Sequence, residues 1–471
     1  MNYQQFISKD KSLLIAPAGF GKTHALAESI SHTPEEKKQL ILTHTHAGIA
    51  SIKEKIKKFN IATTKYHIET ITGFAQKYAL AFYCGDDIPE QENSAKYYSF
   101  IIEKATELLE FEAVKRTVLY SYQGLFVDEY QDCSLIHHQM IMALTKILPT
   151  HILGDPMQGI FDFNETLVDF NNDLIGFEEV GSLNVPWRWN NANRSDLGKD
   201  LSEIRDRLKD GKTVELTKYR SIETVICKEN EWYKPRSLYR NTLTELLGEQ
   251  SLLLIHPISS SVEPRIKILK SFNNRLSLLE SIDAKEFYII AKIIDDWENK
   301  PVILLVRELS YRLFNKSGLD SWFNSTGFKR KQDPIDSRRI EDLKKLIIEI
   351  ENQMKYSSLA ILMQKIMGLP EVKCYRKDLM FALGRALAIA DTDNENVYNA
   401  MVDYKNAVRR VGRKIYGNCI GTTLLTKGLE FDTVAILDAH RFDNYKHFYV
   451  AITRACKRLV IFSQLGTLDF H

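Results

Sequence analysis

Two adjacent carboxylates follow a short apolar stretch in the segment GLFVDEYQD, residues 124 to 132. Gly124 to Val127 predict a buried strand, and Asp128 and Glu129 come directly after its end. In nucleotide hydrolysis, one carboxylate holds Mg²⁺ and another orients or deprotonates the attacking water. The pattern therefore predicts Asp128 as a Mg²⁺ ligand and Glu129 as the catalytic base. The alternative is a simple acidic turn.

A second segment whose residues could take part in the reaction is SLLIAPAGFGKT, residues 12 to 23. It has the composition of a phosphate-binding loop between a strand and a helix. Its small residues let backbone N–H groups turn toward phosphates, its lysine reaches the β- and γ-phosphates, and its threonine hydroxyl binds Mg²⁺. The predicted ATP-binding residues are Ala18, Gly19, Gly21, Lys22 and Thr23. Upstream, Gln5 is predicted to read the adenine edge, with a polar N-terminal arm as the alternative.

Polar and aromatic residues after further predicted strands are candidates for nucleic-acid contacts. Hydroxyls at strand ends suit phosphodiester contacts, and aromatic rings can stack on bases. The candidates are Thr43, Thr45, His46, Thr70, Phe74, Phe161 and Phe163. For the three phenylalanines, packing in the core is the alternative. Gln158, in the segment HILGDPMQGIFDF, is predicted to sense the γ-phosphate or the attacking water.

The elements that must position these residues belong to a globular chain of 471 residues, long enough for two to four domains. The net charge is +2, so overall charge identifies no partner. Two local basic clusters, at residues 53–58 and 409–414, are expected to be solvated helix faces unless nucleic acid covers them.

The six cysteines include no C-x-x-C pair, which argues against a zinc site, an iron–sulfur cluster or a disulfide framework. The N-terminus is polar and no apolar run approaches 18 residues, so we expect neither a secretory signal nor a membrane span. A soluble protein of the reducing cytoplasm is the expectation that follows.

With these motifs collected, the sequence resembles superfamily 1 helicases of the UvrD/Rep/PcrA type. Eight segments match the family's motifs I, Ia, Ib, II, III, IV, V and VI in order: APAGFGKT, LTHTHAG, TITGF, VDEYQD, GDPMQGIFDF, LNVPWR, TTLLTKGLEF and FYVAITRA. The resemblance implies that Arg188 and Arg454 are arginine fingers, that Glu430 contacts the ribose and that Thr422 contacts DNA. Two departures are Pro186-Trp187 before Arg188, where the family has Asn-Tyr, and Leu424, where it has His.

The resemblance also implies an α/β fold with two RecA-like P-loop NTPase domains and reduced, mainly helical insertion domains. The expected first domain is residues 1–182, with a helical insertion at about 85–118. The expected second domain combines residues 183–297 and 411–471, and residues 298–410 form a helical insertion. The implied activity is that of a DNA-dependent ATPase and helicase, translocating 3′ to 5′ on single-stranded DNA with ATP and Mg²⁺.

The wording TLLTKGLEFD and the short insertions are most similar to the helicase-like subunit of the Gabija anti-phage system. That similarity implies a role in antiviral defence and a protein partner, an OLD-type ATPase–nuclease such as GajA. One alternative is an ATP-hydrolysing sensor of DNA ends that activates a partner nuclease with little unwinding. Another is a nucleotide-binding module without a DNA role, such as a kinase, which the paired arginine motifs disfavour.

Overall fold

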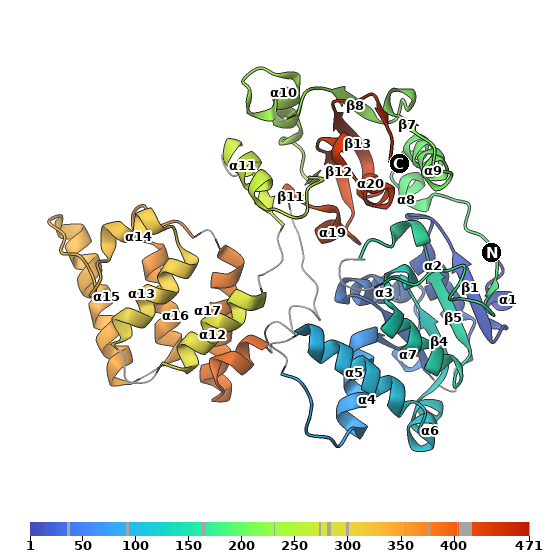
Figure 1. The fold of residues 1–471 in the computed structure, drawn as a ribbon, viewed down its shortest axis with the longest axis horizontal. Coiled ribbons are helices and arrows are strands. Elements are labelled where there is room, and N and C mark those ends of the chain that lie inside the picture. Colours follow the sequence, from blue (N-terminus) through green and yellow to red (C-terminus); the bar gives the residue numbers. More distant parts are fainter. Residues whose placement is uncertain are drawn as a thin grey trace. The chain divides into compact units, whose positions relative to one another are not determined.

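A computed structural model describes the chain apart from residues 35–37, 91–93, 162–165, 230, 273–274, 280–283, 298–300, 354, 375, 403, 405–416 and 471. It divides into two compact units (Figure 1). One unit combines Met1–Glu280 with Gly412–His471, and the other is Ser281–Val411. The basic cluster at residues 409–414 lies outside the described residues.

The larger unit contains two parallel six-stranded sheets, and the first has the strand order β3-β2-β4-β5-β1-β6. The central strands are mostly buried and largely apolar because helices cover both faces of a parallel sheet. The predicted strand before the acidic pair is confirmed and begins two residues earlier, at Tyr122. The strands are β1 (Lys11–Ile15), β2 (Lys38–Thr43), β3 (Tyr66–Thr70), β4 (Tyr122–Val127), β5 (Thr150–Gly154) and β6 (Glu178–Glu179).

Helices cover this first sheet. The predicted helical stretch near residues 85–118 contains α5 and most of α6, and α5 packs with α4 and α7 in one core. On α3, Ile49, Ile52 and Ile56 face the core, and the lysines of the first basic cluster lie on the other side. The helices are α1 (Tyr3–Ile7), α2 (Lys22–Ser31), α3 (His46–Lys58), α4 (Ile71–Phe82), α5 (Ser94–Leu108), α6 (Glu112–Ser121) and α7 (Leu135–Thr145), with the 3₁₀ turns η1 (Thr63–Lys65), η2 (Tyr130–Asp132) and η3 (Pro156–Gln158).

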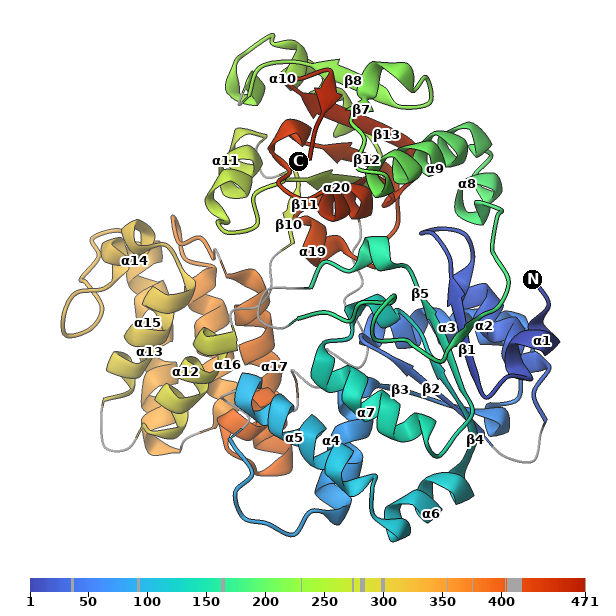
Figure 2. The same ribbon diagram turned by 45° about the vertical axis from the view of Figure 1, so that its right-hand side comes forward.

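The second sheet has the order β10-β11-β9-β12-β13-β8 and is also parallel (Figure 2). Its strands come from both sides of the helical unit in sequence, since Ile420 on β11 pairs with Leu254 on β9. The strands are β8 (Glu223–Ile226), β9 (Leu252–Ile255), β10 (Ser277–Leu278), β11 (Cys419–Gly421), β12 (Phe431–Ile436) and β13 (Ala455–Ser463). Two parallel sheets with surrounding helices confirm the predicted α/β fold class.

The remaining elements of the larger unit surround the second sheet. Its helices are α8 (Trp187–Asn191), α9 (Ser195–Lys209), α10 (Leu238–Leu246), α11 (Glu263–Ser271), α19 (Thr423–Thr426) and α20 (Tyr445–Ile452). The 3₁₀ turns are η4 (Leu216–Lys218), η5 (Glu231–Tyr233) and η6 (Ala439–Arg441), and a short antiparallel pair joins β7 (Val214–Glu215) to β14 (Thr467–Leu468).

The smaller unit is helical and has its own apolar core. It begins at Ser281, before the boundary at residue 298 that the sequence predicted, because α12 buries Ile290, Ala291 and Ile294 in this core. Its helices include α12 (Ala284–Asp295), α13 (Val302–Leu313), α14 (Lys316–Trp322), α15 (Pro334–Asn352), α16 (Tyr356–Met367) and α17 (Lys377–Asp393). In the described part of the chain, no helix has both the length and the apolar character that a membrane span requires.

Candidate nucleotide-hydrolysis site

The phosphate-binding loop lies between β1 and α2, as the sequence predicted. Gly19 and Gly21 have φ angles of 77° and 93°, a region that side chains disfavour. A Cβ on Gly19 would lie 2.9 Å from the ring of Trp189, so the loop also has no room for a side chain there. The buried Lys22 ammonium donates hydrogen bonds to the carbonyl of Ala16 at 2.9 Å and to that of Pro17 at 3.3 Å.

The acidic pair occupies a turn at the carboxyl end of β4. Asp128 is buried, accepts a hydrogen bond from the Glu129 backbone N–H at 3.0 Å and lies next to the Thr23 side chain. Burial, reinforced by the neighbouring Glu129 carboxylate, raises the pKa of Asp128 to about 7. Glu129 has left-handed backbone angles, with φ 56° and ψ 41°. Burial opposes its charge, but the Lys22 and Lys427 ammonium groups outweigh burial and lower the pKa of Glu129, so it is the ionised member of the pair.

The contact between Thr23 and Asp128 fits a magnesium site. Mg²⁺ prefers oxygen ligands and is commonly held by one or two protein groups together with phosphate oxygens and waters. A hydroxyl next to a buried carboxylate at the phosphate-binding loop provides such a donor set. The described residues contain no group of three His, Cys, Asp or Glu side chains that could hold a metal ion without phosphate.

Gln131 connects the acidic turn to the end of the neighbouring strand β5. Its side-chain oxygen accepts a hydrogen bond from the Asp155 backbone N–H at 2.9 Å, and its side-chain nitrogen donates to the Glu129 carboxylate. This buried side-chain amide, which belongs to the first sheet's side of the site, therefore fixes the orientation of the Glu129 carboxylate.

Asp132, at the end of the same turn, is paired with Lys427 from the second sheet's side of the unit. The side chains are only 5% and 8% exposed, respectively, and Lys427 also donates to the backbone oxygen of Gln158. Burial raises the pKa of Asp132 to about 7, although the Lys427 charge acts in the opposite direction. This ion pair joins segments that are 295 residues apart in the chain.

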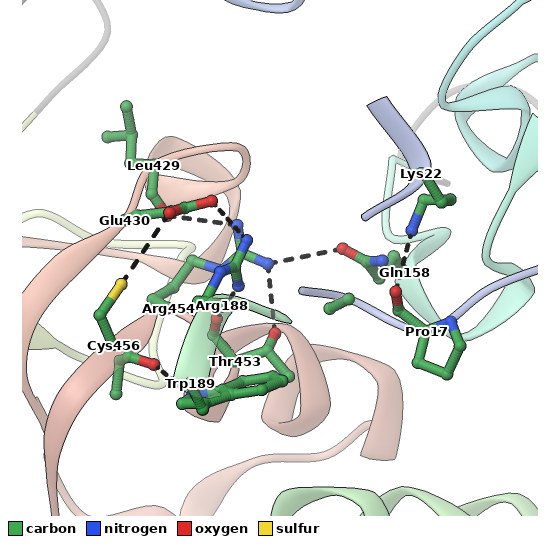
Figure 3. A network of polar contacts seen from close by, with 12 residues as sticks. Pro17, Lys22, Gln158, Arg188, Trp189, Leu429, Glu430, Thr453, Arg454 and Cys456 are labelled. Carbon is green, nitrogen blue, oxygen red and sulfur yellow. Dashed lines mark hydrogen bonds and ion pairs between the residues drawn. The ribbon is translucent and has the colours of Figure 1, made fainter. Parts of the chain in front are cut away.

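The two predicted arginine fingers lie side by side and face Gln158, with Lys22 beyond it (Figure 3). Arg454 is only 2% exposed, and it donates to the Gln158 side-chain oxygen at 3.4 Å and to the Val450 carbonyl at 2.9 Å. Burial, together with the neighbouring Arg188 charge, lowers the pKa of Arg454 to about 10. The structure thus brings together Lys22, Gln158, Arg188 and Arg454, which the sequence assigned to one reaction.

Glu430, which the resemblance assigns to the ribose, is ion-paired with Arg188 at 2.6 Å. Burial raises the pKa of Glu430, but Arg188 outweighs burial, and the net result is a lowered pKa. The second guanidinium nitrogen of Arg188 donates to the Thr453 carbonyl. Arg188 is therefore held in place from two directions on the second sheet's side.

The candidate site contains several residues that the sequence did not predict. Trp187 is 51% exposed, and its ring lies 3.3 Å from where a Cβ of Gly21 would be, so it stands beside the phosphate-binding loop. The only signal for it was its place directly before Arg188. Lys427 was visible only as part of a motif, and the contacts of Tyr449 and Arg205 with Asp155 had no local signal.

Among the predicted DNA-contacting residues, three threonine hydroxyls have different surroundings. Thr45 accepts a hydrogen bond from the Gly48 N–H and Thr70 from the Gly73 N–H, both at 3.0 Å, so both hydroxyls cap helices. The hydroxyl oxygen of Thr43 is buried and has no hydrogen-bond partner among the described residues.

The other predicted contacts differ in exposure. Phe74 is fully buried in the core of the first sheet, as the packing alternative expected, and offers no surface to a base. Phe161 is 37% exposed, with the Lys427 ammonium 4.8 Å from its ring centroid. Thr422 is buried, and its carbonyl accepts a hydrogen bond from Thr426 at 2.9 Å. His46 is half-buried at the start of α3.

Two further predicted residues complete the comparison. Gln5 is exposed on α1, where its backbone N–H donates to the Asn2 side chain at 3.1 Å. The side chain is therefore available at the surface, as an adenine contact requires. Phe163 lies outside the described residues.

One known protein family matches the part of the chain that forms the first sheet. Residues 3–164 match the family model described as an AAA domain. That range contains β1 to β5 and therefore the phosphate-binding loop, the acidic turn and Gln158. A comparison with curated proteins found no match.

Three solved structures are similar to this chain, each over 98% of its length. They are the PRRSV helicase (10% identity, TM-score 0.36), arterivirus nonstructural protein 10, a helicase in complex with DNA (10%, 0.36), and the Pif1 helicase from Candida albicans (12%, 0.40). The chain spans 55% of the first, 63% of the second and 93% of the third.

Proposed function

We propose that this chain is a superfamily 1 ATPase that hydrolyses ATP and translocates on single-stranded DNA. The observation that carries the proposal is the placement of Arg454 and Arg188 beside Gln158, opposite Lys22. Phosphoryl transfer needs positive charge around the γ-phosphate in the transition state. Lys22 provides part of that charge from the first sheet, and the two arginines provide the rest from the second.

The residues then have distinct roles in the reaction. The phosphate-binding loop and Lys22 bind the triphosphate, and Glu129, ionised and fixed by Gln131, accepts a proton from the attacking water. Gln158 orients that water or contacts the γ-phosphate. Mg²⁺, held by Thr23 and Asp128, would neutralise phosphate charge. Trp187 and Gln5 are the side chains proposed to contact the base, and Glu430 the ribose.

Contacts between the two sheets support coupling of hydrolysis to movement on DNA. Arg454 contacts Gln158 and Lys427 contacts Asp132, so residues from the second sheet's side reach candidate catalytic residues of the first. Lys427 lies against both Asp132 and Phe161, so one cation connects the acidic turn to a candidate base-stacking ring. Nucleotide state can therefore bias the distance between the sheets, which is how such motors step.

The finer assignment rests on the motif wording. We propose a UvrD/Rep/PcrA-type enzyme with 3′ to 5′ polarity, acting in the cytoplasm in anti-phage defence as a GajB-like subunit of a Gabija system. Its partner would then be an OLD-type ATPase–nuclease such as GajA. The six free cysteines agree with a reducing compartment.

One set of observations favours a second candidate function, a sensor of DNA ends that activates a nuclease with little unwinding. Phe74 is buried, and the Thr45 and Thr70 hydroxyls are engaged as helix caps. The first sheet therefore has fewer side chains available to bind single-stranded DNA than the motif pattern predicted.

An ATPase assay with no DNA and with single-stranded, blunt and tailed DNA tests the proposed function. We expect DNA to stimulate hydrolysis, and we expect Glu129→Gln to lower kcat by at least about 10²-fold while ATP still binds, because only the base is lost. Near-normal turnover in Glu129→Gln, or a wild-type rate that DNA does not change, would contradict the proposal. A strand-displacement assay, with and without a partner nuclease, separates the motor from the sensor.

A further inference from the structure

The buried carboxylate of Asp155 is the centre of a second polar network, next to the hydrolysis site. Asp155 follows β5 and begins the turn η3 that carries Gln158. One of its oxygens accepts hydrogen bonds from the Met157 N–H at 3.2 Å and from Arg205 at 3.1 Å. The other accepts from the Gln158 side-chain nitrogen at 3.0 Å and from the Tyr449 hydroxyl at 3.3 Å.

Both long-range partners come from the second sheet's side. Arg205 lies on α9 and Tyr449 on α20, and these helices are neighbours in both views of the fold (Figures 1 and 2). The Arg205 guanidinium stacks over the Tyr449 ring, 6.0 Å from its centroid. In the described part of the chain, Arg205 is the cation in ion-pair contact with Asp155, whose side chain is completely buried. Removing Arg205 would therefore leave a buried charge uncompensated.

The network also reaches the phosphate-binding loop. The Tyr449 hydroxyl accepts a hydrogen bond from the Ala18 N–H at 3.1 Å while it donates to Asp155. One hydroxyl therefore connects a loop N–H to the turn that carries Gln158. On the other side of Asp155, its backbone N–H binds Gln131, which holds Glu129.

This arrangement determines which way the Gln158 amide points. Because the Gln158 nitrogen donates to Asp155, its oxygen faces Arg454 at 3.4 Å. A displaced Asp155 would hold the Gln158 nitrogen less well, and the amide would then be free to rotate away from the reacting atoms.

We propose that Arg205 is a positioning residue, which acts through Asp155 and with Tyr449 to orient Gln158 for hydrolysis. The role rests on the proposed ATPase function. Among the described residues, the side-chain contacts of Arg205 are with Asp155, Asp206 and the Tyr449 ring, and Arg205 reaches the phosphate-binding loop only indirectly, through the Tyr449 hydroxyl. Its loss should therefore change the rate of the chemical step more than nucleotide affinity.

The first test is kinetic. We expect Arg205→Met to lower kcat by about 10- to 100-fold, as small displacements of catalytic groups do, with KM for ATP within about threefold of wild type. Tyr449→Phe removes only the hydroxyl and should lower kcat in the same direction. Lys199→Met is the matched control, since Lys199 is exposed and also lies on α9. An unchanged kcat in Arg205→Met, or an equal loss in Lys199→Met, would overturn the proposal.

A double-mutant cycle tests whether Arg205 acts through Asp155. Asp155→Asn keeps the shape but removes the charge that Arg205 compensates. In the Asp155→Asn background, Arg205→Met should change kcat by less than about threefold, because the two residues act as one unit. If Arg205→Met costs as much in that background as in wild type, Arg205 does not work through Asp155.

Backbone hydrogen exchange gives a readout that does not depend on hydrolysis. The N–H groups of Ala18 and Met157 are held in this network, so their peptides should exchange at least about tenfold faster in Arg205→Met than in wild type or Lys199→Met. If wild type does not hydrolyse ATP, the proposed function fails. The exchange experiment still shows whether Arg205 holds the hydrogen-bond network around Asp155 in place. Unchanged exchange in Arg205→Met contradicts the positioning role.

Discussion

Individual carboxylates in the candidate hydrolysis site have opposite electrostatic surroundings. Burial raises the pKa values of Asp128 and Asp132 to about 7, whereas Lys22 and Lys427 outweigh burial at Glu129 and lower its pKa. One member of the adjacent pair is thus suited to accept a proton. The other gains stability when a cation, such as Mg²⁺, compensates its charge.

This difference predicts a pH-dependent stability. A carboxyl group whose pKa is raised in the folded state binds more protons folded than unfolded, so the free energy of unfolding falls as pH rises from about 4 to about 7. Asp128→Asn removes one such group. We expect it to increase the free energy of unfolding at pH 8 by about 1–3 kcal/mol and to change it little near pH 4.

Urea unfolding at pH 4.5 and pH 8, without nucleotide or Mg²⁺, measures this effect. Wild type should lose stability between the two values, and Asp128→Asn should lose less of it, since Asp132 still titrates. The exposed Asp210, paired with Lys212, provides the control variant Asp210→Asn, which should keep the wild-type pH dependence. Identical pH dependence in wild type and Asp128→Asn would contradict the buried, uncompensated state of Asp128.

At the scale of elements, the two sheets contribute opposite ends of their strands. The phosphate-binding loop, the acidic turn and the η3 turn follow the carboxyl ends of β1, β4 and β5. Glu430 and Arg454 instead stand directly before β12 and β13. The site therefore depends on how closely loops from one sheet fit residues from the other.

The fit is tight at Gly19, where both the backbone conformation and the Trp189 ring exclude a side chain. We expect Gly19→Ala to lower the free energy of unfolding by about 1–3 kcal/mol and to weaken ATP binding, because the loop must shift. Gly466→Ala, in the same unit and with no atom within 4 Å of the added carbon, is the control. Equal stability and equal ATP affinity of the two variants would show that the Gly19 contact is not tight.

At the scale of the whole molecule, the chain consists of two units with separate cores. The helical unit Ser281–Val411 interrupts the second sheet between β10 and β11, yet β11 still pairs with both β10 and β9. Its apolar core includes the fully buried aromatic side chains of Trp322, Phe314 and Phe323. A unit with this much internal packing has the features of an independently folding domain.

A fragment of residues 281–411 should therefore fold alone. We expect a helical circular dichroism spectrum and a cooperative thermal transition. Trp322→Ala, which empties a large site in the core, should destabilise the fragment by about 3–5 kcal/mol. A fragment that is unfolded, or that melts without cooperativity, would show that its core needs the rest of the chain.

The sequence by itself determined the phosphate-binding loop, the acidic pair and the strands that carry them. These features are local, because the apolar run, the glycines and the reactive side chains are neighbours along the chain. The order of the motifs also linked Arg188 and Arg454 to Lys22, because all three residues lie in segments that resemble one series of family motifs.

Only the tertiary structure decided which side chains are buried and which segments meet. Phe74 fills the core, Asp132 pairs with a lysine 295 residues away, and α12 joins the helical unit instead of the second sheet. The pairing of Arg205 with Asp155 likewise had no sequence signal. Burial and long-range hydrogen bonds depend on the packing of elements against one another, and no local pattern of residues encodes that packing.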